Sequence, residues 1–141
     1  MISKEVSVFV ARPIGEVFDY LTDLSKAHEW GDDVVRAEAH GDPAVGTTGV
    51  YVQKFMGREV ENEVEVTAYN PPYELCYRST SGPVSFQGCQ RCAEQDGGTL
   101  LSQTISAEAG GFFKVAEGMV GNQLESSMQK DFENLKAILE G

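Results

Sequence analysis

Hydrophobic and polar side chains alternate most regularly between residues 59 and 66, near the middle of the chain. Every odd position there is Glu and every even position is Val or Asn, in the order Glu59-Val60-Glu61-Asn62-Glu63-Val64-Glu65-Val66. A helix would scatter the glutamates around its circumference, whereas a strand places them on one face. The stretch therefore predicts a strand with its glutamates in water and its valines against a core.

Weaker patterns on either side predict the other strands and two short helices. Alternation over residues 5–10 indicates a first strand, and apolar side chains at helical spacing over residues 14–21 indicate a helix. Ser25 can cap a second short helix that ends near Trp30. Turn-forming Gly, Pro, Asn and Asp residues then delimit six strands, at about residues 34–40, 47–56, 58–69, 73–80, 84–94 and 99–107.

The C-terminal segment predicts a long helix with one continuous apolar face. An arc of about 120°, wide enough to cover a sheet, holds Val120, Leu124, Met128, Phe132, Leu135, Ile138 and Leu139. Glycines surround a short apolar run where this helix begins. We predict that residues 110–121 form a movable gate that a ligand orders. The alternative is that these glycines only allow close packing against the short helices.

The order of these elements predicts the fold class. One strand is followed by two short helices, six strands in hairpin succession and one long helix. We expect an α+β fold in which a seven-stranded, curved antiparallel sheet surrounds the long C-terminal helix. The two short helices after the first strand would close one end of the sheet.

Composition limits the partners and the compartment. The chain has 141 residues, with 22 acidic and 11 basic side chains and a formal net charge of −11, so we expect one domain over residues 1–141. Nucleic acid and anionic lipid are disfavoured as partners, because both bind clustered Lys and Arg. The sequence has no long apolar run and no signal-peptide pattern, so we expect no membrane span and a cytoplasmic monomer or homodimer.

The sequence offers little for metal or cofactor chemistry. Cys89 and Cys92 match a CxxC pattern, but an offset of three in a strand sends the two thiols to opposite faces. Cys76 offers no companion pair, and the two histidines, His28 and His40, lack ligand spacing. The four regularly spaced glutamates share one solvated strand face. We therefore predict structural cysteines, no metal site and no cofactor.

Three polar side chains fall on apolar faces and are candidates for a cavity. Asn62 shares the core-facing side of the regular strand, and Gln103 shares a face with apolar neighbours on the last strand. Asp131 falls inside the apolar arc of the helix; if it is buried its pKa rises, which suits a general acid or base. The alternatives are a water-bridged amide, a sheet-edge glutamine and an aspartate on an exposed rim.

Aromatic side chains are further candidates, since Tyr and Trp combine an apolar body with a polar tip. The same side chains could instead simply fill the core. The predicted ligand-binding set is Tyr20, Trp30, Tyr51, Phe55, Asn62, Tyr77, Phe86, Gln103, Phe112, Met119, Gln123 and Met128. The predicted catalytic set is Asp131 with Asn62 or Tyr77.

Several segments, in this order and spacing, are typical of one superfamily. They are Arg12-Pro13-Ile14-Gly15-Glu16-Val17-Phe18-Asp19-Tyr20-Leu21-Thr22-Asp23, Glu29-Trp30, Val45-Gly46-Thr47, Val66-Thr67-Ala68-Tyr69-Asn70-Pro71-Pro72, Gly97-Gly98-Thr99 and Leu135-Lys136-Ala137-Ile138-Leu139-Glu140. The chain thereby resembles the START-related superfamily (SRPBCC), which includes polyketide cyclases, lipid-transfer domains and the birch-pollen allergen. The resemblance covers essentially the whole chain and is greatest to the polyketide cyclase/dehydrase-like branch.

The resemblance implies the helix-grip fold, with an apolar cavity between the sheet and the long helix. Members of this superfamily bind apolar molecules there, and some catalyse cyclisation or dehydration. Three functions are consistent with it: a binding or carrier protein for a lipid- or polyketide-like molecule, a polyketide cyclase or dehydratase, and a protein-interaction or regulatory module. Convergent polar groups in the pocket favour catalysis, a uniformly apolar pocket favours carriage, and an exposed apolar patch over a filled core favours interaction.

Overall fold

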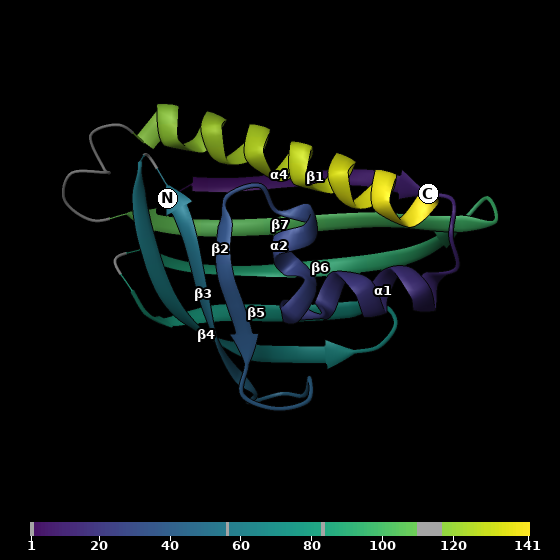
Figure 1. The fold of residues 1–141 in the computed structure, drawn as a ribbon, viewed down its shortest axis with the longest axis horizontal. Helices are drawn as coiled ribbons and strands as arrows, with labels where there is room; N and C mark the ends of the chain where they lie inside the picture. The colour runs from purple at the N-terminus through teal and green to yellow at the C-terminus, as the bar shows by residue number, and fades with distance from the viewer. Residues whose placement is uncertain (1, 56, 83, 110–116) are drawn as a thin grey trace.

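A computed structural model of the protein describes residues 2–55, 57–82, 84–109 and 117–141 (Figure 1). The chain begins with β1 (Ile2–Val10), α1 (Ile14–Thr22), the 3₁₀ turn η1 (Leu24–Lys26) and α2 (Ala27–Trp30). It continues with β2 (Val34–Ala39), β3 (Thr48–Phe55), β4 (Arg58–Asn70), β5 (Glu74–Ser81), β6 (Val84–Gln95) and β7 (Gly98–Ala109), and ends with α4 (Glu117–Glu140). The predicted gate at residues 110–121 lies largely outside the described residues.

The seven strands form one antiparallel sheet in the order β1-β7-β6-β5-β4-β3-β2. Register shifts interrupt the β2–β3 ladder and the β4–β5 ladder. Shifts of this kind bend and twist a strand, and Figure 1 shows the curved sheet below α4, which lies along β1. The predicted α+β helix-grip fold is therefore confirmed. In the part of the chain that the structure describes, no helix is long and apolar enough to cross a membrane.

Strand β4 confirms the strand expected from the alternating glutamates. Its valines line the concave side of the sheet, and three of the four glutamates are exposed. The fourth, Glu65, is half-buried, and Arg78 Nη2 of β5 lies 3.4 Å from its Oε1 atom. The valines are themselves only half-buried, because they face a hollow rather than a filled core.

Large apolar side chains hold α4 against the sheet. Met128, Phe132 and Leu135 are buried in one cluster with side chains of β1, α1 and β7. Near the end of the helix, Lys136 Nζ donates a hydrogen bond to the Phe9 carbonyl oxygen at 2.6 Å. Most of the apolar face predicted for the C-terminal helix therefore packs on the sheet. Ile138, which the predicted arc included, is instead 43% exposed, and the Val120 side chain lies outside the described part of the chain.

Asp23, rather than Ser25, caps the second helical segment. The Asp23 carboxylate accepts hydrogen bonds from the Ser25 backbone N–H at 3.0 Å and from the Ser25 hydroxyl at 2.6 Å. A short acidic side chain commonly bonds the backbone two residues ahead and starts a tight turn. The turn η1 therefore precedes α2, and the expectation that Ser25 is the cap is wrong.

The cysteines occupy both faces of the β5–β6 ladder. Cys92 is buried in the core, and burial raises the pKa of its thiol to about 12. Cys89 lies on the opposite face, as the offset of three predicts, and forms a disulfide with Cys76. This disulfide was not predicted from the sequence; it forms because antiparallel pairing sets Cys76 directly opposite Cys89.

Reduction of this disulfide is expected to lower the free energy of unfolding by about 2–4 kcal/mol, because the cross-link restricts the unfolded chain. Urea unfolding with and without a reductant measures the difference. The double variant Cys76→Ser/Cys89→Ser should show one midpoint in both conditions, and Cys92→Ala is the matched control that keeps the cross-link. An unchanged urea midpoint for the reduced wild-type protein would contradict the expectation.

Candidate functional site

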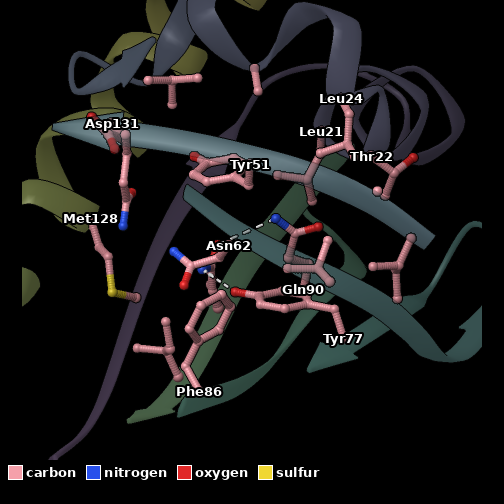
Figure 2. A pocket seen from close by; sticks show the side chains of 18 of the residues that line it. Leu21, Thr22, Leu24, Tyr51, Asn62, Tyr77, Phe86, Gln90, Met128 and Asp131 are labelled. Carbon is pink, nitrogen blue, oxygen red and sulfur yellow. Dashed lines mark hydrogen bonds between the residues drawn. The ribbon is translucent and has the colours of Figure 1, made fainter. Parts of the chain in front are cut away.

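A cavity of about 270 Å³ lies between the concave face of the sheet and α4. Every strand of the sheet contributes to its lining, together with α1, α2 and α4. Its walls are mainly apolar, and Figure 2 shows Leu21, Phe86 and Met128 among the side chains that surround it. An apolar hollow with a small number of polar groups is typical of sites that bind small molecules.

Three polar side chains form a hydrogen-bonded chain on the sheet side of the cavity (Figure 2). Gln90 Nε2 donates to Gln103 Oε1 at 3.4 Å, and Gln103 Nε2 donates to the Tyr77 hydroxyl at 2.9 Å. Burial raises the pKa of Tyr77, so its hydroxyl keeps its proton at neutral pH. No side chain within the described ranges accepts that proton. The Tyr77 hydroxyl is therefore left as a donor toward the cavity.

Gly88 allows the Tyr77 ring to lie where it does. A Cβ atom at residue 88 would lie only 2.8 Å from the Tyr77 hydroxyl oxygen. The Phe86 ring packs edge-on against the same tyrosine, with 6.1 Å between ring centroids. The position of the Tyr77 hydroxyl is therefore fixed by packing as well as by its hydrogen bond.

Asn62 is the most buried polar side chain of the cavity, with an exposed fraction of 2%. It lies in β4 directly opposite Tyr51 of β3. Its Oδ1 atom is buried against Gly82 and has no hydrogen-bond partner among the described residues. An unpaired buried polar atom costs about 1–3 kcal/mol, so a ligand or water that bonded this amide would stabilise the occupied cavity.

Asp131 places a carboxyl group where α4 meets the turn between α2 and β2. The Asp32 backbone N–H donates to Asp131 Oδ1 at 3.2 Å. Burial raises the pKa of Asp131 to about 6, and the Asp32 and Asp33 carboxylates act in the same direction. The hydrogen bond from Asp32 and the Lys130 ammonium act against the rise. A carboxyl with such a pKa can both give and take a proton near neutral pH.

Tyr51 lies beside Asp131 in the same cavity. Its pKa is raised, first by burial and then by the nearby Tyr77 and acidic side chains. Figure 2 shows the Tyr51 hydroxyl turned toward the side of the cavity where Asp131 and Met128 project from α4. The cavity therefore has two polar regions, one at the Tyr77 chain and one at Asp131.

Most of the site residues predicted from the sequence line this cavity: Trp30, Tyr51, Asn62, Tyr77, Phe86, Gln103, Met128 and Asp131. The structure places Tyr20 and Gln123 outside it. The Tyr20 hydroxyl donates to Glu29 Oε1 at 2.9 Å, and Gln123 is exposed on α4, beside the apolar arc rather than within it. The Phe55 and Met119 side chains and residue Phe112 lie outside the described part of the chain.

Sequence reasoning missed Gln90, Asp33 and Lys54, which also line the cavity. Gln90 lies two residues from the buried Cys92, so strand alternation could have placed it on the concave face. Asp33 follows α2 in a turn and Lys54 lies near the end of β3. The curvature of the sheet brings these two residues to the cavity, and no local pattern in the sequence signals it.

A model of the family described as "Polyketide cyclase / dehydrase and lipid transport" matches residues 1–140. The chain belongs to this family. The resemblance to the polyketide cyclase/dehydrase-like branch of the START-related superfamily is thereby confirmed. No curated protein matches the chain.

Solved structures of low sequence identity share the fold of this polyketide cyclase/dehydrase family member. TTHA0849 of Thermus thermophilus is 16% identical, with a TM-score of 0.85 over 96% of this chain and 94% of its own. The Zhui aromatase/cyclase of Streptomyces is 17% identical, with a TM-score of 0.79 over 98% of this chain and 93% of its own. Ara h 8.0201 is 12% identical, with a TM-score of 0.70 over 97% and 96%. Such likeness shows the fold alone.

Proposed function

We propose that the protein binds a small apolar molecule, lipid-like or polyketide-like, in the cavity between the sheet and α4, and that residues 1–141 act as one START-like domain. The observation that carries the proposal is the hollow concave face. Val64, Phe86 and Ile105 are half-buried although they point inward, because they line the cavity. Covering apolar surface is worth about 25 cal/mol per Å², so an apolar ligand is the occupant that gains most.

The hydrogen-bonded chain gives such a ligand an orientation. The Tyr77 hydroxyl has a proton to donate and is held in place by Gln103. A carbonyl or ether oxygen on the ligand would accept a hydrogen bond from the Tyr77 hydroxyl, and the rest of the molecule would contact the apolar walls. A mostly apolar molecule with few oxygens matches this lining better than a sugar or a nucleotide does.

Filling the cavity tests the proposal. Ile105→Trp places a large side chain in the cavity from β7, and we expect about a tenfold or greater loss of affinity for N-phenyl-1-naphthylamine, an uncharged fluorescent probe. Val35→Trp, at an exposed position of β2, is the matched control and should bind the probe like the wild type. Fluorescence titration measures affinity, and circular dichroism checks folding.

Val64→Trp fills the same cavity from β4. A loss of probe binding in both variants therefore cannot come from a folding defect particular to residue 105. Probe binding that is equal in the wild type and in both filled variants, or absent from the wild type, would contradict the proposal. Native mass spectrometry of the purified protein should in addition detect a co-purifying lipophilic molecule.

A polyketide cyclase or dehydratase is the second candidate, and Asp131 is the residue that favours it. Aldol-type cyclisation needs a general acid or base beside the forming enolate and a hydrogen-bond donor for the enolate oxygen. Asp131 has a pKa of about 6 in an apolar cavity, and Tyr77 or Asn62 would serve as the donor. The Zhui aromatase/cyclase has the same fold, which is compatible with a cyclase function.

A protein-interaction module has less support. Among the described residues, the exposed large apolar side chains are Val35, Val45, Tyr73 and Ile138; they belong to different elements of the chain and do not come from one strand or helix face. An interaction surface normally needs a contiguous apolar patch. A cytoplasmic monomer or homodimer that binds no nucleic acid remains our prediction for the protein's setting.

A further inference from the structure

Among the described residues, the charged side chains that line the cavity are Asp33, Asp131 and Lys54. Two of them are acidic, and none of the described arginines or histidines lines the cavity. Lys54 is exposed, and none of the described carboxylates lies within ion-pair distance of its ammonium group. The Asp33 backbone carbonyl accepts the Lys54 N–H at 2.8 Å, which places the two residues side by side at the rim.

A third carboxylate, that of Asp32, borders this region but already has partners. Lys130 Nζ lies 3.1 Å from Asp32 Oδ2, and Asn134 Nδ2 donates to Asp32 Oδ1 at 3.0 Å. The nearest lysine on α4 is therefore engaged by Asp32. This pair leaves the charges of Asp33 and Asp131 without a bonded cation among the described side chains.

Asp131 is the more buried of the two acidic residues in the lining, since Asp33 is exposed. It is half-buried, and the only hydrogen bond found for its carboxylate within the described ranges is the one from the Asp32 N–H to Oδ1. The Oδ2 atom is thus left without a partner. The Tyr51 hydroxyl is turned toward this side of the cavity (Figure 2).

Asn62 carries a second acceptor that lacks a donor. It is 2% exposed and lines the same cavity, and its Oδ1 atom, buried against Gly82, has no hydrogen-bond partner among the described residues. The lining also holds two donors without an acceptor among the described side chains, the Trp30 Nε1–H and the Tyr77 hydroxyl. The charge at Asp131, rather than these neutral groups, therefore decides which end of a ligand lies beside it: an N–H group can donate to Asp131 Oδ2, and a carboxylate cannot.

We propose that the ligand of this cavity carries a cationic amine that pairs with Asp131, and that the amine is attached to an apolar body in contact with the apolar walls of the cavity. This inference rests on the proposed function, because it names the class of molecule that the same cavity takes. A carboxylic acid of equal size meets repulsion from Asp33 and Asp131 in a partly desolvated site, where charge interactions are stronger than in water. Fatty acids and other anionic lipids are thereby disfavoured.

The groups that face Asp131 set the pH range of this selectivity. They are Asp32 and Asp33 from the α2–β2 turn, Lys130 from α4, and Tyr51 from β3. Burial raises the pKa of Asp131 to about 6, so the carboxylate is largely ionised at pH 7.5 and largely protonated at pH 5. The attraction for an ammonium group is therefore present at pH 7.5 and is lost as the pH falls through about 6.

Three naphthalene compounds of matched size test the proposal, by displacement of N-phenyl-1-naphthylamine from the wild-type protein at pH 7.5. They are 2-(2-naphthyl)ethylamine, 2-(2-naphthyl)ethanol and 2-naphthylacetic acid, which are cationic, neutral and anionic. We expect the amine to bind about tenfold more tightly than the alcohol, which corresponds to about 1.4 kcal/mol, and the acid to bind more weakly than either. At pH 5 the preference for the amine over the alcohol should fall toward unity.

Three variants assign the selectivity to its residue. Asp131→Asn should remove most of the preference for the amine over the alcohol, and Asp33→Asn, at an exposed position, should reduce that preference in part. Glu133→Gln is the matched control: it removes one negative charge from the exposed side of α4 and should leave the preference unchanged.

The outcomes separate this inference from the function on which it rests. If the uncharged probe and the alcohol fail to bind the folded wild-type protein, the proposed cavity function fails. If both bind and the amine is no better than the alcohol, or the acid binds best, the amine inference alone is overturned, and an acid preference would point to Lys54. Equal loss of all three ligands in Asp131→Asn would likewise overturn the role of this carboxylate.

Discussion

Phe132→Ala is expected to lower the free energy of unfolding by about 3–5 kcal/mol, the usual cost of removing a large aromatic side chain from a core. The Phe132 side chain is 1% exposed and belongs to the buried cluster that joins α4 to the sheet. Its ring packs against the Trp30 ring, with 6.2 Å between centroids. The cavity already lies on one side of Phe132, so the truncated site would have few neighbouring atoms able to fill the new space.

Chemical unfolding followed by circular dichroism measures this loss. Ile138→Ala is the matched control, because Ile138 lies on the same helix and is 43% exposed; its unfolding free energy should change by no more than about 1 kcal/mol. A loss below about 1 kcal/mol for Phe132→Ala would mean that α4 is not held on the sheet by this cluster. The packing described for the C-terminal helix would then be wrong.

The strands and the long helix could be predicted because their patterns are local. In β4, a repeat of two residues fixes which side chains share a face, whatever the rest of the sheet does. In α4, the spacing of Met128, Phe132 and Leu135 defines the buried side in the same way. The Cys76–Cys89 disulfide has no such local signal, since it depends on the register between β5 and β6.

The cavity itself could be predicted only in part. Asn62 and Asp131 were recognised because a polar side chain interrupts an otherwise apolar face, and such interruptions can be seen in one element alone. Tyr20 was included as an aromatic residue, but its hydroxyl is bonded to Glu29 on the outside of the cavity. Asp33 could not be predicted in this way, because the direction in which a turn side chain points depends on the elements packed around it.

Asp131→Asn is expected to slow cyclisation of a reactive poly-β-keto thioester by about 10²–10⁴-fold, if the protein catalyses this reaction as its second candidate function requires. This is the usual contribution of a positioned general acid or base. Asparagine has nearly the shape of aspartate but cannot take a proton from carbon at neutral pH. Product formation followed by chromatography, with the uncatalysed rate subtracted, measures the effect.

The pH dependence of the wild-type rate distinguishes a catalytic role of Asp131 from a purely structural one. If Asp131 acts as a base with a pKa of about 6, the rate rises with pH and levels off above about pH 7. The rate of the Asp131→Asn variant should lack this rise, while Glu133→Gln should keep the wild-type rate and profile.

A wild-type rate no faster than the uncatalysed reaction would exclude the cyclase function for this substrate class. A catalysed rate that Asp131→Asn leaves unchanged would instead show that another group moves the proton, and the Tyr77 hydroxyl, the donor fixed on the sheet side of the same cavity, would be the next residue to replace.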